Sequence, residues 1–356
     1  MEVEFAEARS PGPREARRRR PIPASWGDHT LRVVAIGGGT GLPAVLGGLA
    51  RFSRRGAAGK RVEITAVVAA SDDGGSSGRL RRENGVLPPG DVRNCLIALA
   101  DDHSRSLARL FRYRFGQGRG LRGHSLGNLL LTALTSLEGD FLAAIGRAER
   151  MLRCQGRVLP ATLEPVRLVG VLEDGGRVEG ERNFVGERQS RIARVELLPR
   201  APSPAPGVLD AIRAADVIVL GPGSLYSSVI TNLLVDGVAD AIRESRALRI
   251  LVQNLMTEPG ETSGLDAVAH VEAVLRHGGK VADVLLVDGR PKVANELLRG
   301  YARKGQHPVQ LDSRKVLAHG LVPVEADLIA AGARVRHDPD KLAAAVIGLA
   351  LQASEA

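Results

Sequence analysis

The chain has 356 residues, with 49 Lys or Arg against 40 Asp or Glu, and carries a formal net charge of +9. Its length suffices for one large α/β domain or two ordinary ones with ample hydrophobic core. Aromatic residues make up only 3% of the chain, and the basic residues are scattered among acids. This composition disfavours a nucleic-acid partner, although the positive charge would attract a small anionic ligand.

Cys95 and Cys154 lie far apart and have no Cys or His partner at metal-ligand spacing. This pattern is typical of buried thiols in a reducing compartment. There is no run of 18 apolar residues, and no apolar signal core follows the charged N-terminus. We therefore expect a soluble cytoplasmic protein with no integral membrane segment.

Residues 1–30 are rich in Pro, Arg and Glu, a composition that cannot bury a hydrophobic core. We predict a disordered Arg- and Pro-rich tail there, followed by a single α/β domain at 31–356. Within this domain, 156–199 changes to short alternating runs around an Asp-Gly turn. That pattern predicts a small antiparallel β insertion.

A first buried strand is predicted at 31–36, and it ends in a glycine-rich loop that leads into a helix near Pro43. Pro suits a first helical turn, and the free backbone N–H groups at a helix start form an anion site. Leu42 stands where the dinucleotide-binding fingerprint requires a third glycine, so phosphate binding is favoured over a standard NAD site. The candidate ligand contacts in this loop are Gly38, Gly39, Thr40 and Gly41.

A second buried strand at 64–70 is followed by the polar loop SDDGGSSGR at 71–79. The continuous apolar run indicates a parallel strand covered on both faces, and ligands bind at the carboxyl end of such strands. The alternative is an ordinary solvated turn, because Asp, Gly and Ser are common turn formers. The candidate ligand contacts in this loop are Asp72, Asp73, Ser76 and Ser77.

Two predicted helix starts carry further polar residues. Asp91 can cap a helix that begins at Val92, which places Asn94 in its first turn. His124 and Asn128 share one face near the start of a helix at 124–137. The candidate ligand contacts here are Asn94, His124 and Asn128.

Parallel-strand character resumes at 216–220 and 249–252, and both strands end in polar loops that supply Gly223, Ser224 and Asn254. In a doubly wound sheet such loops gather along one carboxyl edge. The sequence therefore predicts a Rossmann-like, doubly wound, mostly parallel sheet with a small antiparallel β insertion. A phosphorylated or nucleotide-like ligand is expected at the shared edge.

Five motifs together resemble the YvcK proteins, bacterial gluconeogenesis factors in the superfamily of CofD, the 2-phospho-L-lactate transferase of coenzyme F420 synthesis. The resemblance covers about residues 31–352 and leaves the tail outside. The motifs are GGGTGL at 37–42, SDDGGSSGR at 71–79, LPPGDVRNCL at 87–96, GHSLGN at 123–128 and GPGSLY at 221–226.

The resemblance implies a cytoplasmic protein that binds UDP-sugars such as UDP-N-acetylglucosamine and is needed for cell shape and envelope synthesis during gluconeogenic growth. It assigns no catalytic activity. It implies a protein partner in envelope synthesis, whose identity is unknown, and it is compatible with a homo-oligomer. Arg336 matches an arginine that would contact phosphate or sugar. A tyrosine common in the family after the Pro-Gly-Glu-Thr segment is replaced here by Leu265.

We interpret the chain as a UDP-sugar-binding regulatory protein without catalytic residues. The alternative is a CofD-like transferase in which Asp72, Asp73 and Asp91 gather Mg²⁺, since the resemblance places a metal-binding acid at Asp72 or Asp73. Metal-dependent turnover of a nucleotide substrate would distinguish the transferase. An NAD-dependent oxidoreductase is disfavoured by the glycine spacing.

Overall fold

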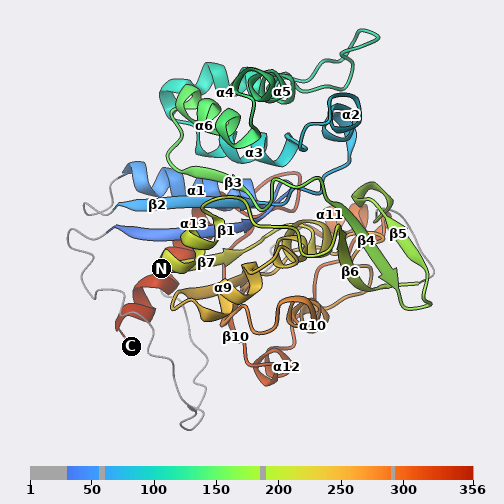
Figure 1. The fold of residues 1–356 in the computed structure, drawn as a ribbon. Coiled ribbons are helices and arrows are strands. Elements are labelled where there is room, and N and C mark those ends of the chain that lie inside the picture. The colour runs from blue at the N-terminus through green and yellow to red at the C-terminus, as the bar shows by residue number, and fades with distance from the viewer. Residues whose placement is uncertain (1–29, 56–60, 185–189, 290–292, 356) are drawn as a thin grey trace.

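The computed structural model describes residues 30–55, 61–184, 190–289 and 293–355. Helices cover both faces of a central sheet, with α3 to α6 on one side and α9, α10 and α12 on the other (Figure 1). The tail predicted at 1–30 lies outside the described residues, except for its last position. No single helix in these ranges is long and apolar enough to cross a membrane, and one bent pair, Leu225–Leu233 with Val238–Glu244, passes by length and composition only.

The central sheet has seven strands in the order β10-β9-β8-β7-β1-β2-β3, and every neighbouring pair is parallel. From β1 the chain adds β2 and β3 on one side, then returns to add β7 to β10 on the other. This order confirms the predicted doubly wound, Rossmann-like sheet, and its switch point lies between β1 and β7. The strands are β1 (Leu31–Gly37), β2 (Val62–Val68), β3 (Arg157–Pro160), β7 (Val217–Leu220), β8 (Leu248–Val252), β9 (Val284–Asp288) and β10 (Val322–Ala326).

Two hydrophobic cores form because alternate residues of each strand point to opposite faces. In β1, Val33 and Ala35 join the core beneath α1, α3, α6 and α13, whereas Val34 and Ile36 join the core beneath α7, α9 and α10. The helices are α1 (Leu42–Arg55), α2 (Gly75–Asn84), α3 (Gly90–Leu99), α4 (Arg105–Arg112), α5 (Leu126–Glu138), α6 (Phe141–Leu152), α7 (Val208–Ala214), α8 (Thr231–Leu233), α9 (Val238–Glu244), α10 (Ala267–Gly278), α11 (Asn295–Ala302), α12 (Ser313–Ala318) and α13 (Pro339–Glu355). Short 3₁₀ turns cover Asp102–Ser104 and Glu181–Phe184, and a π-helix covers Leu225–Ile230.

A separate three-stranded antiparallel sheet, in the order β5-β4-β6, confirms the predicted β insertion. Its strands are β4 (Arg167–Leu172), β5 (Arg177–Glu179) and β6 (Ile192–Leu198). The predicted start at 156 differs from the structure, because residues 157–160 pair in parallel with β2 and form the edge strand of the main sheet. This RVLP segment begins with arginine and ends with proline, so it lacks the continuous apolar run that marks β7, and its sequence favours the insertion.

The contact between α1 and α13 depends on a glycine. A Cβ at Gly48 would overlap the carbonyl oxygen of Pro339, whereas a Cβ at Gly47 would lie 3.6 Å from Arg51 Nη1. We predict that Gly48→Ala lowers the free energy of unfolding by about 2–3 kcal/mol through overpacking. Gly47→Ala is the matched control and should raise stability by about 0.5–1 kcal/mol, since alanine favours a helix interior. Urea denaturation would measure both, and equal effects would contradict the assigned packing.

Candidate functional site

A cleft of about 1290 Å³ opens at the carboxyl edge of the central sheet. Its floor is made by the loops after β1 and β7, the two adjacent strands at the switch point. Thr40 and Gly41 line it from the first loop, and Pro222, Gly223 and Ser224 line it from the second. The cleft therefore lies where an open α/β sheet places its ligand.

Two glycines of the first floor loop lie too close to neighbouring groups to accommodate a side chain. A Cβ at Gly41 would overlap the carbonyl oxygen of Pro222, and a Cβ at Gly38 would lie 2.8 Å from Asp91 Oδ2. Helix α1 begins directly after this loop, and Pro43 and Ala44 of its first turn also line the cleft. The positive end of a 14-residue helix thus faces the cavity, which favours an anionic ligand group there.

Asn254 holds the second floor loop in place. Its Nδ2 donates to the carbonyl oxygen of Gly223 at 2.7 Å, and its Oδ1 accepts from the Gly223 N–H at 3.2 Å. Because both ends of the amide are engaged, we assign Asn254 as a positioning residue for the loop. Ser224 lines the cleft directly beyond it.

Seven arginines line the cleft, which gives it a positive potential. Arg51 is paired with Asp340 at 2.7 Å, and Asp102 accepts from Arg105 at 3.1 Å. Four exposed arginines form no ion pair within the part of the chain that the structure describes, so their guanidinium groups are available to an anion. These four are Arg109, Arg112, Arg334 and Arg336.

An aromatic ring also lines the cleft. Tyr301 of α11 faces the segment that carries Arg336, and its hydroxyl accepts a hydrogen bond from Val335 N at 3.0 Å. Leu265, where the family resemblance leads one to expect a tyrosine, lines a different cavity. Tyr301 is not among the residues predicted from the sequence, because no strand-end or helix-start pattern marks it.

The predicted residues His124, Ser76 and Asn128 lie behind the cleft, each at most 4% exposed. They form a hydrogen-bonded chain, in which Ser76 Oγ lies 3.0 Å from His124 Nδ1 and accepts from Asn128 Nδ2 at 3.1 Å. Arg93 extends this chain by donating to Asn128 Oδ1 and to Asn94 Oδ1, both at 2.7 Å. The network therefore orients Asn94 from behind.

Asn94 is the point where this network reaches the cleft. It lines the cavity, and its Nδ2 donates to the carbonyl oxygen of Gly39 at 3.3 Å. The N–H of Gly39 donates in turn to Asp91 Oδ2 at 2.7 Å. Asp91 does not cap its own helix as predicted, because α3 already begins at Gly90 with no side-chain cap. Instead it fixes the glycine loop, a role that helix-start patterns do not reveal.

The carboxylates predicted to bind metal serve backbone groups in this structure. Asp72 accepts from Gly74 N at 2.8 Å, and Asp73 accepts from Arg182 N at 3.1 Å. Ser77 hydrogen-bonds Asp72, and burial is the main cause of the raised pKa of that carboxyl. Among the described residues no three His, Cys, Asp or Glu side chains are placed to hold a metal ion. The side chains present therefore do not fit a preformed Mg²⁺ site, and metal binding stays a prediction.

Comparison with known proteins places this fold and cleft in a family. The family model for 2-phospho-L-lactate transferase CofD matches residues 33–329. A relative from Thermotoga maritima is 46% identical over 317 residues, which cover 88% of this chain and 97% of the relative. The gluconeogenesis factor of Bacillus subtilis is 40% identical over 320 residues, covering 89% and 98%. A crystal structure of a Bacillus halodurans protein superposes with a TM-score of 0.84 at 42% identity, covering 89% of this chain and 99% of that one.

The fold and the cleft thus define a doubly wound α/β protein with a candidate ligand cleft at its switch point. The chain belongs to the CofD family and, within it, to the YvcK group of gluconeogenesis factors. Some relatives are longer, since the chain spans 67% of the one from Nostoc.

The buried carboxyl of Asp91 predicts a pH effect on stability. Burial, and secondly repulsion by Asp72, raise the pKa of Asp91 from 3.8 to about 6. Because the folded state then holds the proton more tightly, stability falls as pH rises from about 4 to about 6, and the loss is complete above that window. Asp91→Asn keeps an oxygen acceptor for Gly39 N–H without the charge. We predict that it raises the free energy of unfolding at pH 7.5 by about 1–3 kcal/mol, and by about zero at pH 4.

Denaturant unfolding at the two pH values would measure this difference, with the exposed Asp236→Asn as the control. A loss of stability in Asp91→Asn at pH 7.5 would show that the charge of Asp91 is favourable and would contradict the expectation.

Proposed function

We propose that this protein is a cytoplasmic regulatory factor whose cleft binds UDP-N-acetylglucosamine or a closely related UDP-sugar. The observation that carries the proposal is the meeting of the α1 N-terminus, two glycine loops and four arginines that form no ion pair with any described residue, all in one cavity. A diphosphate suits this combination, because helix N-termini and arginines are the usual protein partners of phosphate.

The size and lining of the cleft support a ligand larger than a phosphate. Its volume of about 1290 Å³ exceeds the roughly 300–1,000 Å³ of ordinary small-molecule pockets, so nucleoside and sugar can be held together. We place the diphosphate at Thr40 and Gly41, with Arg336 adding charge. Tyr301 offers a ring face for stacking on the base or the sugar. Ser224 would close over the opposite side.

The regulatory role rests on family membership, since the relatives from Bacillus subtilis and Halalkalibacterium halodurans are named gluconeogenesis factors. We propose that ligand binding shifts the protein between two states that a protein partner in envelope synthesis distinguishes, and so supports cell shape during gluconeogenic growth. Such a shift requires that the ligand bind the two states with different affinity.

A Mg²⁺-dependent transferase is the second candidate, and one observation favours it. Burial and repulsion by Asp72, Asp91, Glu261 and Asp73 raise the pKa of Glu181 well above its usual range. A bound cation would relieve this repulsion, although the described side chains are not preorganised to hold one. Turnover of a nucleotide substrate that appears only with Mg²⁺ would establish this candidate.

The proposal predicts that UDP-N-acetylglucosamine binds without a metal ion. Titration calorimetry with UDP-N-acetylglucosamine should give a Kd of about 1–100 μM with or without Mg²⁺, and no released UDP. Arg336→Gln should weaken binding by about 10- to 100-fold, the value of a charge-assisted hydrogen bond of about 1.5–3 kcal/mol. The exposed Arg246→Gln, outside the cleft, should bind normally. Absence of binding to the wild-type protein would refute the proposal.

Two substitutions test the aromatic contact. Tyr301→Ala should weaken UDP-sugar binding by about 5- to 100-fold, since base stacking on an aromatic ring contributes roughly 1–3 kcal/mol. Tyr301→Phe keeps the ring and removes only the hydroxyl that accepts from Val335 N, so its Kd should change by less than about threefold. Equal losses in the two variants would indicate that Tyr301 acts by holding the 330–339 segment rather than by stacking.

A further inference from the structure

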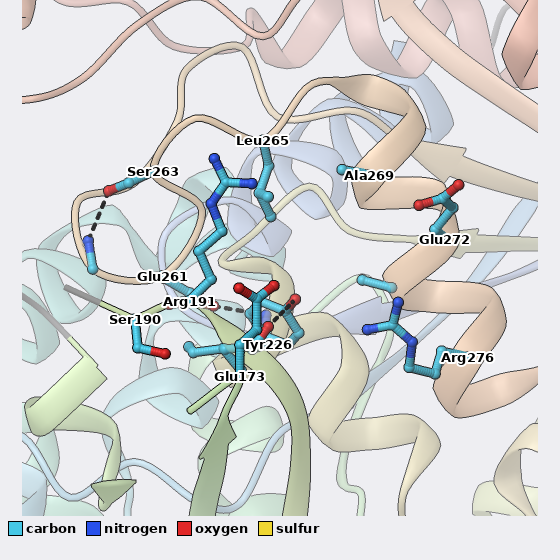
Figure 2. A pocket seen from close by; sticks show the side chains of 13 residues that line it. Glu173, Ser190, Arg191, Tyr226, Glu261, Ser263, Leu265, Ala269, Glu272 and Arg276 are labelled. Carbon is cyan, nitrogen blue, oxygen red and sulfur yellow. Dashed lines mark hydrogen bonds between the residues drawn. The ribbon is translucent and has the colours of Figure 1, made fainter. Parts of the chain in front are cut away.

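A second cavity, of about 200 Å³, lies between the small antiparallel sheet and α10 and is lined by different residues from the cleft (Figure 2). We call it the side pocket. Tyr226 of the π-helix and Glu261 of the loop before α10 form its floor. Its remaining lining comes from the two facing walls, with Glu173, Ser190 and Arg191 on one and Glu272 and Arg276 of α10 on the other.

Two arginines in the side pocket have N–H groups that make no hydrogen bond to a described residue. Figure 2 shows the Arg191 side chain rising between Ser263 and Leu265, with Arg276 beside Glu272 on the far wall. The guanidinium of Arg191 makes no hydrogen bond or ion pair with any residue in the described ranges. Arg276 Nη1 donates to the carbonyl oxygen of Ala193 at 2.6 Å, which leaves its other N–H groups for a ligand.

The side pocket also holds three glutamates, and two of them are engaged by protein groups. Glu272 is engaged by His319 Nε2 at 3.2 Å, and Glu261 accepts backbone N–H groups from the π-helix. Glu173 is exposed and can accept from a hydroxyl group. Ser263 Oγ already accepts from Gly260 N at 3.1 Å, so its own O–H is free to donate. The lining therefore combines guanidinium and hydroxyl donors with carboxylate acceptors, of which Glu173 is the one turned to solvent.

We propose that the side pocket binds a compact hydroxylated anion, a small phosphate monoester or hydroxycarboxylate, between Arg191 and Arg276, and that its occupancy changes the affinity of the cleft. The second half of this proposal rests on the function proposed above. A cavity of about 200 Å³ is below the roughly 300–1,000 Å³ that drug-sized ligands occupy, which excludes a second nucleotide sugar. The arginines would hold the charged group, and Glu173 and Ser263 would hold the hydroxyls.

Two backbone segments run from the cleft to the side pocket. In the first, Ser224 lines the cleft and Tyr226 lines the side pocket two residues later. In the second, Glu258 lines the cleft, and Gly260 and Glu261 line the side pocket. A ligand that moves the floor of the side pocket therefore moves residues that face the nucleotide sugar.

Hydrogen bonds tie the two segments together at both ends. Glu261 accepts from Tyr226 N at 2.6 Å and from Ser227 N at 3.0 Å, and Ser224 hydrogen-bonds the side chain of Glu258. The first turn of the π-helix is closed by Val229 N, which donates to the carbonyl oxygen of Ser224 at 3.0 Å. π-Helical turns occur frequently at functional sites and give an element with an alternative α-helical register. That element can carry the coupling between the two cavities.

Calorimetric titration of the full-length protein, without nucleotide, tests the side pocket itself. The probes are glycerol 3-phosphate, malate and inorganic phosphate. We expect glycerol 3-phosphate or malate to bind, and inorganic phosphate to bind at least fivefold more weakly because it lacks hydroxyls on a carbon frame. Arg191→Gln should weaken binding at least tenfold with an unchanged unfolding temperature, and Arg213→Gln, an exposed arginine of α7, should bind normally. No binding by either hydroxylated probe, or equal binding by Arg191→Gln, would overturn the proposal.

The coupling is tested by titrating UDP-N-acetylglucosamine with and without the bound probe. We expect at least a threefold change in Kd in the wild-type protein and none in Arg191→Gln. Side-pocket binding with an unchanged UDP-sugar Kd would overturn the coupling. Side-pocket binding in a protein that binds no UDP-sugar would instead refute the proposed function and leave the second site standing.

Discussion

Parallel pairing of β1 with β7 is the contact from which the site follows. Gly221 N donates to the carbonyl oxygen of Ile36 at 2.9 Å, so the two strands end side by side and their loops meet at one edge. The chain leaves in opposite directions from these strands, which opens a crevice instead of a covered loop. Glycine at position 41 allows the loops to touch, because a Cβ there would overlap the carbonyl oxygen of Pro222. The N-terminus of α1 is thereby aimed into the cleft.

The buried acids behind the cleft lower the stability of the folded state, but they fix the geometry of the cleft loops. Burial raises the pKa values of Asp72, Asp91 and Glu181, so their charges oppose folding at neutral pH. Asp91 nonetheless fixes Gly39, and Arg93 donates a hydrogen bond to Asn94. Such strain is common where a binding site must be preorganised. Stability and ligand binding are therefore set by the same few side chains.

Much of this arrangement was accessible from the sequence. Continuous apolar runs located β1, β2 and β7, and the glycine and hydroxyl residues after them located the carboxyl edge. The sequence could not show which polar side chains are consumed by internal hydrogen bonds. Ser76, His124 and Asn128 bond to one another in the structure, and their contact with a ligand stays a prediction. Tyr301 was missed because it reaches the cleft from α11, remote from every strand end, and only tertiary packing brings it there.

A crystal structure of the protein with UDP-N-acetylglucosamine would test the central claim most directly, because it locates the diphosphate. We expect the phosphate oxygens within hydrogen-bond distance of the backbone N–H groups at 40–42 and of the Arg336 guanidinium, with the nucleoside beside Tyr301. A diphosphate bound instead at Asp72 and Ser77 through a metal ion would contradict this placement. It would assign the cleft to a second substrate and the protein to the transferases.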